Sequence, residues 1–261
     1  MDLGLKGKVV LITGGSKGIG LACARAFLAE GARVAIVSRS PANLEAARRD
    51  LSAAAGDLIA VSCDLTEKNI AAAMVTEAEG RLGPIDVLVN SAGAAKRYLP
   101  EELNEEAWHA AMEAKYFTYI HAMEAILPAM VKRGRGVIVN IIGMGGKVAT
   151  PIHLPGGAAN SALMLATVGL ANAYGAKGIR INAINPGSTM TDRVREALKL
   201  EAKKRNQSEE EVLAQSQAKV PLKRYAAPED IANLALFLAS NKANYITGAI
   251  VPMDGGLNPV L

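Results

Sequence analysis

The sequence predicts one α/β domain built on a doubly wound parallel sheet of about seven strands, with helices on both faces. Three observations carry this prediction. Short apolar segments alternate with longer helical segments along nearly the whole chain. The apolar segments are almost continuous, as in Val9–Thr13 (VVLIT), which is typical of strands buried on both faces. The 261 residues show no linker or internal repeat, so we expect residues 1–261 to form a single domain.

The elements follow one another in a regular order. Strands are expected at Val9–Thr13, Arg33–Val37, Leu58–Ser62, Asp86–Val89, Val137–Ile141, Ile179–Ile184 and Ala249–Val251. Helices are expected at Gly18–Ala29, Pro41–Ala55, Glu67–Arg81, Glu105–Lys132, Ala158–Ala176 and Pro228–Ala239. Pro41 and Pro228 stand where the first turn of a helix tolerates proline. This alternation indicates right-handed crossovers between parallel strands.

The segment 188–224 interrupts this rhythm because it is long, charged and helical. Ser208 and Glu211 form a capping box that predicts the start of its second helix. An α/β sheet binds ligands at the carboxyl edge of its strands, so a helical insertion after a strand is expected to cover that edge. We therefore interpret 188–224 as a substrate lid, with a plain surface excursion as the alternative.

Composition and charge exclude several function classes. The formal net charge is only +4, and the cluster Lys203–Arg205 adjoins the acidic residues Glu209–Glu211, which predicts a solvated surface. Nucleic-acid binders carry a clustered basic stripe, so we expect a small anionic ligand and no nucleic acid. The two cysteines, Cys23 and Cys63, form no disulfide framework or metal motif, which favours a cytoplasmic protein.

Neither a membrane span nor a metal site is expected. The uncharged run Val148–Ala176 contains Pro151, Pro155 and several glycines, which predicts a loop followed by a short helix. His109 and His121 lie on one predicted helix and are interpreted as surface or packing residues rather than metal ligands.

A glycine-rich turn joins the first strand to the first helix. It has the sequence Thr13-Gly14-Gly15-Ser16-Lys17-Gly18-Ile19-Gly20. The glycines permit a tight turn and let the backbone approach a pyrophosphate, while the helix N-terminus offers unpaired N–H groups. This placement predicts a Rossmann-like dinucleotide site at Gly14, Ser16, Lys17, Gly18, Ile19 and Gly20, with a purely structural turn as the alternative.

The end of the second strand favours NADP(H) over NAD(H). A site for NAD usually has an acidic residue there that binds the ribose 2′-hydroxyl. This chain has Ser38-Arg39 instead, and Arg39 together with Lys17 could bind a 2′-phosphate. The alternative is that both are ordinary surface cations.

Taken together, the motifs resemble the classical short-chain dehydrogenase/reductase family, in order and over nearly the whole chain. Besides the glycine turn, they include Cys63-Asp64-Leu65, Asn90-Ser91-Ala92-Gly93, Asn185-Pro186-Gly187 with Thr191, and Asp254-Gly255-Gly256. Ser91 departs from the family's second asparagine. The resemblance implies that the cofactor is also contacted by Asp64, Leu65, Asn90, Ala92, Gly93, Asn160, Pro186, Gly187 and Thr191.

The family's catalytic positions carry other residues here. The family uses a serine, a Tyr-x-x-x-Lys pair and an asparagine, and the tyrosine transfers the proton. An alignment through Gly178-Ile179-Arg180 places the serine position at Gly143 and the asparagine position at Lys115. The tyrosine position falls at Gly156 and the lysine position at Asn160. No Tyr-x-x-x-Lys occurs in the chain. The resemblance therefore implies a divergent member that lacks the Ser, Tyr and Lys residues.

Other groups could supply the missing chemistry, because a developing oxyanion needs a proton or a hydrogen bond. Lys115 is the first candidate, since a desolvated lysine can act as a general acid or base. His153 is the second candidate, because the pKa of a histidine lies near neutral pH. Asn160 can still bind ribose hydroxyls. We predict that Lys115 projects into the space left by the tyrosine ring. The alternatives are a solvated Lys115 and an ordinary loop histidine at His153; Lys147 and Tyr98 are weaker candidates.

Two functions from different classes remain open. One is an NADP(H)-dependent oxidoreductase with an atypical proton donor and an unidentified carbonyl or alcohol substrate. The other is a catalytically silent dinucleotide-binding sensor or partner subunit. The resemblance, together with the apolar helix Ala158–Ala176, implies a homodimer or homotetramer.

Overall fold

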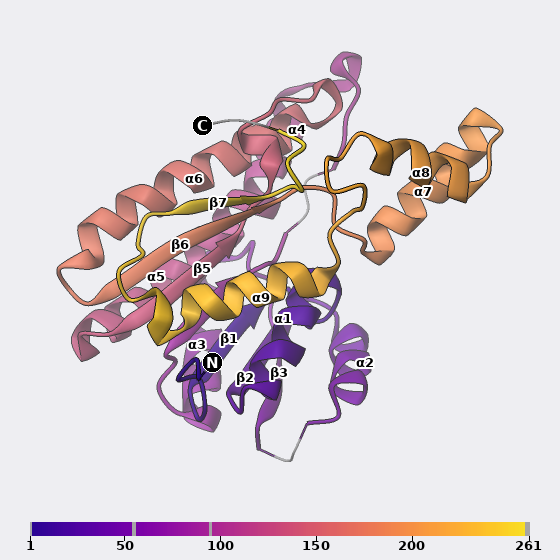
Figure 1. Cartoon of the computed structure of the whole chain (residues 1–261). Coiled ribbons are helices and arrows are strands. Elements are labelled where there is room, and N and C mark those ends of the chain that lie inside the picture. Colours follow the sequence, from indigo (N-terminus) through magenta and orange to yellow (C-terminus); the bar gives the residue numbers. More distant parts are fainter. Residues whose placement is uncertain (1, 54–55, 94–95, 259–261) are drawn as a thin grey trace.

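The computed structural model describes residues 2–53, 56–93 and 96–258. Within them the chain forms a seven-stranded parallel sheet with the order β3-β2-β1-β4-β5-β6-β7 (Figure 1). The predicted single α/β domain with a doubly wound parallel sheet is confirmed. The strands are β1 Val9–Thr13, β2 Arg33–Ser38, β3 Leu58–Ser62, β4 Val87–Asn90, β5 Gly136–Ile141, β6 Ile179–Pro186 and β7 Ile250–Met253.

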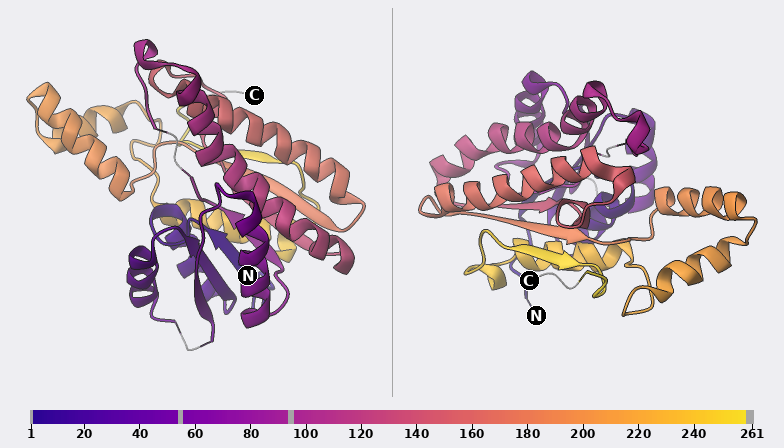
Figure 2. Two further views of the ribbon diagram at one scale, coloured as in Figure 1. Left: turned by 180° about the vertical axis from the view of Figure 1, so that it is seen from behind. Right: turned by 90° about the horizontal axis from the view of Figure 1, so that it is seen from above.

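Two layers of helices cover the sheet (Figure 2). The described helices are α1 Gly18–Ala29, α2 Pro41–Leu51, α3 Lys68–Leu82, α4 Glu105–Ala111, α5 Thr118–Arg133, α6 Leu154–Gly175, α7 Asp192–Arg205, α8 Glu209–Ala218 and α9 Pro228–Ala239. Apolar residues of α1, α2 and α9 pack on one face of the sheet, and those of α3, α5 and α6 pack on the other. Burial on both faces explains why β1 and β4 have no exposed residue.

Three of the predicted helices differ from the structure by more than one residue. The helix α2 ends at Leu51, because Ser52 adopts a left-handed conformation with φ +43°; the predicted end at Ala54 and Ala55 lies outside the described residues. The long helix expected over 105–132 is split by a π-helical segment, Met112–Phe117, between α4 and α5. The helix α6 begins at Leu154 and has 22 residues, so the expected short helix was wrong: Pro155 lies in its first turn, where proline is tolerated.

The apolar segment Pro151–Gly175 is, among the described helices, the one long and apolar enough to cross a membrane by length and composition alone. Half of that apolar window is buried inside the domain. Leu163, Met164 and Ala171 of α6 belong to the core beneath the sheet. Burial against β-strands accounts for this apolar character as it does in the core helices of globular domains.

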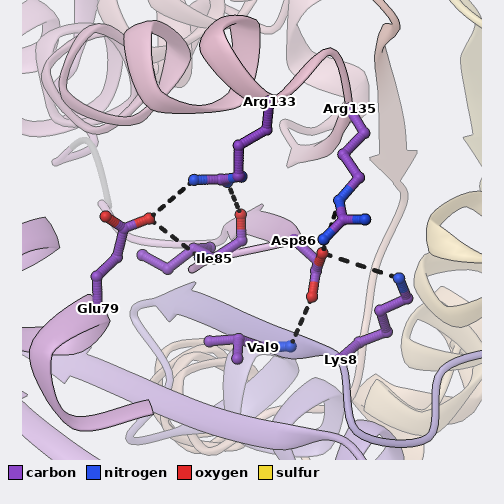
Figure 3. A network of polar contacts seen from close by, with 7 residues as sticks. All are labelled: Lys8, Val9, Glu79, Ile85, Asp86, Arg133 and Arg135. Atoms are coloured by element: carbon purple, nitrogen blue, oxygen red, sulfur yellow. Dashed lines mark hydrogen bonds and ion pairs between the residues drawn. The ribbon is translucent and has the colours of Figure 1, made fainter. Parts of the chain in front are cut away.

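A polar network fixes α5 at the amino edge of the sheet (Figure 3). Arg133, in the last turn of α5, donates to the carbonyl of Ile85 at 2.6 Å and to the Glu79 carboxylate of α3 at 3.3 Å. Asp86 accepts from the backbone N–H of Val9 at 3.2 Å. The two Arg133 contacts hold the C-terminal end of α5, and the opposite end of the same helix leads to the carboxyl edge of the sheet.

The carboxyl edge contains the topological switch point. The chain runs outward from β1 to β3 and then returns to β4 on the other side of β1. The connections after β1 and β4 therefore diverge and leave a crevice, which is where doubly wound sheets bind ligands. Thr13 and Asn90 end the two strands at this point.

The segment 188–224 forms the helical hairpin α7–α8, which extends outward from this edge (Figures 1 and 2). Ser208 caps α8 and forms the predicted capping box with Glu211. A bridge between Thr189 and Ala226 closes the base of the segment. The hairpin starts beside the crevice, and its role as a lid stays a prediction.

Candidate functional site

The glycine turn after β1 is packed too tightly for side chains. Gly14 has φ +68°, and a β-carbon there would lie 2.8 Å from the backbone of Ala92, in the turn after β4. A β-carbon at Gly20 would lie 2.3 Å from the carbonyl oxygen of Gly14. The turns after β1 and β4 therefore meet through their backbones, with Ser16 buried and Ile19 half-buried.

The first turn of α1 offers free N–H groups at this crevice. Lys17 is its N-cap residue, and no side chain caps the helix there. Uncapped backbone N–H groups and the helix dipole together form an anion-binding site. Thr191, at the start of α7, lies against this turn, since a β-carbon at Gly18 would be 3.3 Å from its methyl group. The structure thus brings the predicted residues Lys17, Gly18 and Thr191 together.

A buried chain of polar side chains ties the strand ends to α6. Thr13 donates to Asn90 at 3.2 Å, Asn90 to Asn140 at 3.0 Å, and Asn140 to Thr167 at 3.0 Å. All four residues have no exposed surface. Thr13 also accepts from the backbone N–H of Ala92 at 3.3 Å. The side chain of Asn90, predicted to contact the cofactor, is therefore buried within this chain of hydrogen bonds, next to the turn that leads to Gly93.

Arg39, predicted to favour NADP(H), follows β2, and Asp64 and Leu65, predicted to contact the cofactor, follow β3. Arg39 is 72% exposed, and its guanidinium lies 3.8 Å from the carboxylate of Asp64. Asp64 also accepts from the hydroxyl of Thr66 at 2.8 Å. Leu65 is buried, and its carbonyl contacts the ring of His121 at 2.8 Å, which explains this histidine as a packing residue.

The end of β6 approaches the crevice from the other side. The strand continues through the buried Pro186, two residues beyond the predicted end. Gly187 donates its N–H to the carbonyl of Met253 at 2.9 Å, and a β-carbon at Gly187 would lie 2.8 Å from the side chain of Asp254. This close approach requires glycine.

Glycines occupy the positions aligned with the family's serine and tyrosine. Gly143 has φ +134°, and a β-carbon there would lie 3.3 Å from the amide nitrogen of Asn160. A β-carbon at Gly145 would lie 3.1 Å from the ring of His153. Gly156 is buried at the start of α6. The loop after β5 and the start of α6 therefore bring Asn160 and His153 to one place.

Two buried polar atoms at this place have no hydrogen-bond partner within the described part of the chain. They are Oδ1 of Asn160 and Nδ1 of His153. Asn160 is 5% exposed, and a polar atom left unpaired at such depth is costly. A buried polar atom without a partner needs a physical explanation, and a bound polar ligand is one that fits this place.

Lys115 is buried, with 8% of its surface exposed. It lies in the π-helical segment, where a β-carbon at Gly93 would be 3.2 Å from its Cα atom. Its Nζ atom lies 2.8 Å from the hydroxyl of Tyr119 and 3.1 Å from the carbonyl oxygen of Ile141, the last residue of β5. The solvated alternative for Lys115 is wrong.

Burial and neighbouring positive charges lower the pKa values of Lys115 and His153. Desolvation, followed by the charge of Arg193 in α7, lowers the pKa of Lys115 to about 7. Desolvation, followed by Arg97 and Lys115, lowers the pKa of His153. Burial raises the pKa of Tyr119 far above its usual range. At neutral pH the Lys115 amine can therefore both give and take a proton, and Tyr119 stays protonated.

The two weaker candidates, Lys147 and Tyr98, lie on loops next to His153 but make no side-chain hydrogen bond with Lys115, His153 or Asn160 in the described structure. Lys147 is exposed after the loop that follows β5. Tyr98 is half-buried, and its backbone N–H donates to Ile152 at 3.2 Å. Tyr119 and Asn140 could not be predicted as site residues, because both stand in apolar sequence surroundings typical of packing and no local signal reveals their distant partners. In the described residues, no cluster of three or more metal-ligating side chains occurs.

A doubly wound sheet with a glycine turn at its switch point defines a Rossmann-fold protein. The family profile described as "Enoyl-(Acyl carrier protein) reductase" matches residues 14–258. 2-(S)-hydroxypropyl-CoM dehydrogenase 3 of Xanthobacter autotrophicus is 34% identical over 256 residues, which cover 98% of each chain. This chain therefore belongs to the classical short-chain dehydrogenase/reductase family.

Solved structures agree with this assignment. L-sorbose reductase from Gluconobacter frateurii, in complex with NADPH and L-sorbose, has a TM-score of 0.93 and 30% identity over 100% of both chains. An NADPH-bound short-chain oxidoreductase from Pseudomonas aeruginosa PAO1, described as containing an atypical catalytic center, has a TM-score of 0.86 and 30% identity. That match covers 97% of this chain and 98% of the other.

Proposed function

We propose that this protein is an NADP(H)-dependent oxidoreductase of the short-chain type that interconverts a carbonyl and an alcohol with Lys115 at the substrate oxygen. The observation that carries the proposal is the buried Lys115 amine. The amine contacts the carbonyl of Ile141 at the carboxyl end of β5, and Ile141 stands two residues before Gly143. The pKa of the amine is lowered to about 7. A buried amine at that pKa is rare outside functional sites.

The residues present fit a dinucleotide cofactor. The backbone cradle at Gly14 and Gly20 leaves no room for a β-carbon, and the unpaired Oδ1 of Asn160 can accept from a ribose hydroxyl. The N-terminus of α1 would hold the pyrophosphate. Lys17 and Arg39, with no acidic residue in β2, favour NADP(H), as do the NADPH-bound structural neighbours. When bound, the cofactor supplies or accepts the hydride.

The chain's own residues handle the proton and the charge. As an ammonium, Lys115 donates to the substrate oxygen and stabilises the negative charge that develops there. As an amine, it accepts the proton of an alcohol in the reverse direction. His153 passes protons between this lysine and solvent, because it is half-buried and its lowered pKa keeps it neutral at pH 7. Arg193 in α7 adds a positive charge that acts on Lys115.

The alternative is a silent sensor or partner subunit, which would bind NADPH without turnover. The test combines NADPH titration by fluorescence with turnover assays on a panel of ketones, aldehydes, sugars and hydroxy acids. We expect binding with turnover, and we expect Lys115→Met to lose at least about a hundredfold in kcat, the low end for a general acid–base group. Lys132→Met is the matched control, since Lys132 is exposed on α5.

Each other outcome has a defined meaning. NADPH binding without turnover on the whole panel supports the silent alternative. Full turnover in Lys115→Met removes the lysine from the proposed chemistry. Failure to bind NADPH contradicts both functions.

We further propose that the protein works in the cytoplasm as a homodimer or homotetramer. Leu165 and Val168 on α6 are 78% and 43% exposed, and such apolar residues on one helix face favour self-association.

A further inference from the structure

Lys115 and Tyr119 form a closed triangle of hydrogen bonds with the end of β5. The lysine Nζ donates to the Tyr119 hydroxyl at 2.8 Å and to the Ile141 carbonyl at 3.1 Å. The tyrosine hydroxyl donates to the same carbonyl at 2.5 Å. The Nζ atom also lies 4.4 Å from the centre of the Tyr119 ring, within cation–π range. Tyr119 has no exposed surface, so its hydroxyl serves this triangle and no outside ligand.

Counting protons shows what the triangle leaves for a substrate. The tyrosine hydroxyl has one proton and gives it to Ile141, so it can only accept from Lys115. An ammonium has three N–H groups, and two of them are engaged within the triangle. One N–H remains in the charged form, and one lone pair remains in the neutral form. The triangle therefore leaves one donor or one acceptor at a fixed position.

That remaining position belongs to the candidate site. The lysine backbone lies against the Gly93 turn, and its amine lies beside Ile141, two residues before Gly143. The positive charge of Lys115 also contributes to the lowered pKa of His153. A substrate oxygen in contact with the amine would have to use this single free direction.

We propose that Tyr119 is the positioning residue for Lys115: its hydroxyl directs the one free N–H or lone pair of the amine into the site. This inference rests on the function proposed above, in which Lys115 contacts the substrate oxygen. The two residues are four apart in the order Lys-x-x-x-Tyr, so they project from one side of the helix. The π-helical turn that carries Lys115 belongs to a class of distortions common at functional sites.

Tyr119 is also needed to keep a proton on the amine. The charge of Arg193 in α7 lowers the pKa of Lys115, and Lys115 in turn lowers the pKa of His153 before α6; neither Arg193 nor His153 is acidic. In the described structure the charged form is supported only by the Tyr119 hydroxyl, the tyrosine ring and the Ile141 carbonyl. Removal of the hydroxyl should therefore lower the pKa of Lys115 further, because a hydrogen bond to the charged form favours it.

The test compares Tyr119→Phe with Tyr116→Phe. Tyr119→Phe removes the hydroxyl and keeps the ring, while Tyr116 is a neighbouring half-buried tyrosine that stacks edge-on against Phe117. Lysine labelled with ¹³C at Cε reports the titration of each amine by NMR, and Lys115→Met identifies the Lys115 signal. This readout needs neither substrate nor turnover.

We expect the Lys115 signal to titrate about one pH unit lower in Tyr119→Phe and at the wild-type position in Tyr116→Phe. In turnover, kcat should fall at least about tenfold in Tyr119→Phe, with KM and NADPH affinity changing much less. Tyr119→Met, which fills the space without a hydroxyl, replaces the phenylalanine variant where that variant does not fold.

An unchanged Lys115 titration in Tyr119→Phe overturns the proposal, as does full turnover in that variant beside an inactive Lys115→Met. The second result leaves the proposed function intact. Full turnover in Lys115→Met has the opposite meaning, because it removes the function on which the positioning role depends.

Discussion

The backbone of Ala92 occupies the place where a β-carbon of Gly14 would lie, with a separation of 2.8 Å. Neither side can yield, because both atoms belong to turns that follow central strands of the sheet. Gly14 also has φ +68°, which costs other residues about 1–2 kcal/mol. This contact brings the turns after β1 and β4 together at the switch point.

Gly14→Ala should therefore reduce both stability and cofactor binding. We expect the free energy of unfolding to fall by about 2–4 kcal/mol, from backbone strain and overpacking together. Urea denaturation and NADPH titration measure the two effects. Gly80→Ala is the control, because no atom lies within 4 Å of a β-carbon there; it should be neutral or slightly stabilising. Wild-type stability and affinity in Gly14→Ala would contradict the close approach.

Stability should rise with pH because of Lys115. Its pKa is about 7 in the folded protein against 10.5 for a free side chain, so the folded state binds fewer protons between these values. The free energy of unfolding therefore increases as pH rises from about 7 to 10.5. Lys115→Met removes this buried titrating group. By linkage, a pKa difference between 10.5 and about 7 corresponds to about 4–5 kcal/mol, so we expect Lys115→Met to be more stable than wild type by about that amount at pH 6.

That gain should nearly vanish at high pH, where the wild-type amine is neutral. Urea denaturation across this pH range measures the free energy of unfolding of wild type, of Lys115→Met and of the exposed-lysine control Lys132→Met. An equal pH slope in wild type and Lys115→Met would show that Lys115 titrates normally.

Arg39 should set the preference between the two cofactors. We expect NADPH to bind at least about tenfold more tightly than NADH, since one charge-assisted phosphate contact is worth about that much. Arg39→Asp should remove most of this difference and add repulsion with Asp64, which lies 3.8 Å from the wild-type guanidinium. Arg49→Asp makes the same charge change at an exposed position of α2 and should leave the ratio unaltered. Equal affinities in wild type would refute the assignment.

Leu165 should lie in a subunit interface. We expect light scattering at micromolar concentration to give a dimer or tetramer of the 27.2 kDa chain. Leu165→Glu should shift the mass toward the monomer, because a charge is costly in an apolar contact. Leu200→Glu, on the exposed face of α7, is the control and should leave the mass unchanged. A monomeric wild type, or an assembled Leu165→Glu, contradicts the prediction.

The doubly wound sheet and its glycine turn could be predicted from local patterns. Continuous apolar runs such as Val9–Thr13 specify strands buried on both faces, and five or six residues suffice to reveal them. The turn at Gly14 is equally local, because glycine is required by a backbone conformation within the motif itself. Family membership followed from these motifs and their order.

Only the tertiary structure decided what Lys115 and Tyr119 do. A helical pattern gives residues a common face but not the direction of that face, and the π-helical segment at Met112–Phe117 alters the register at this point. The pKa of Lys115 depends on burial against Ile141, which is 26 residues away, and on Arg193 in the hairpin. Tyr119 has the sequence environment of a packing residue because its polar partner is a backbone carbonyl from another element. Strands and turns were predictable because neighbouring residues determine them, whereas the proton chemistry of the site depends on groups that only folding brings together.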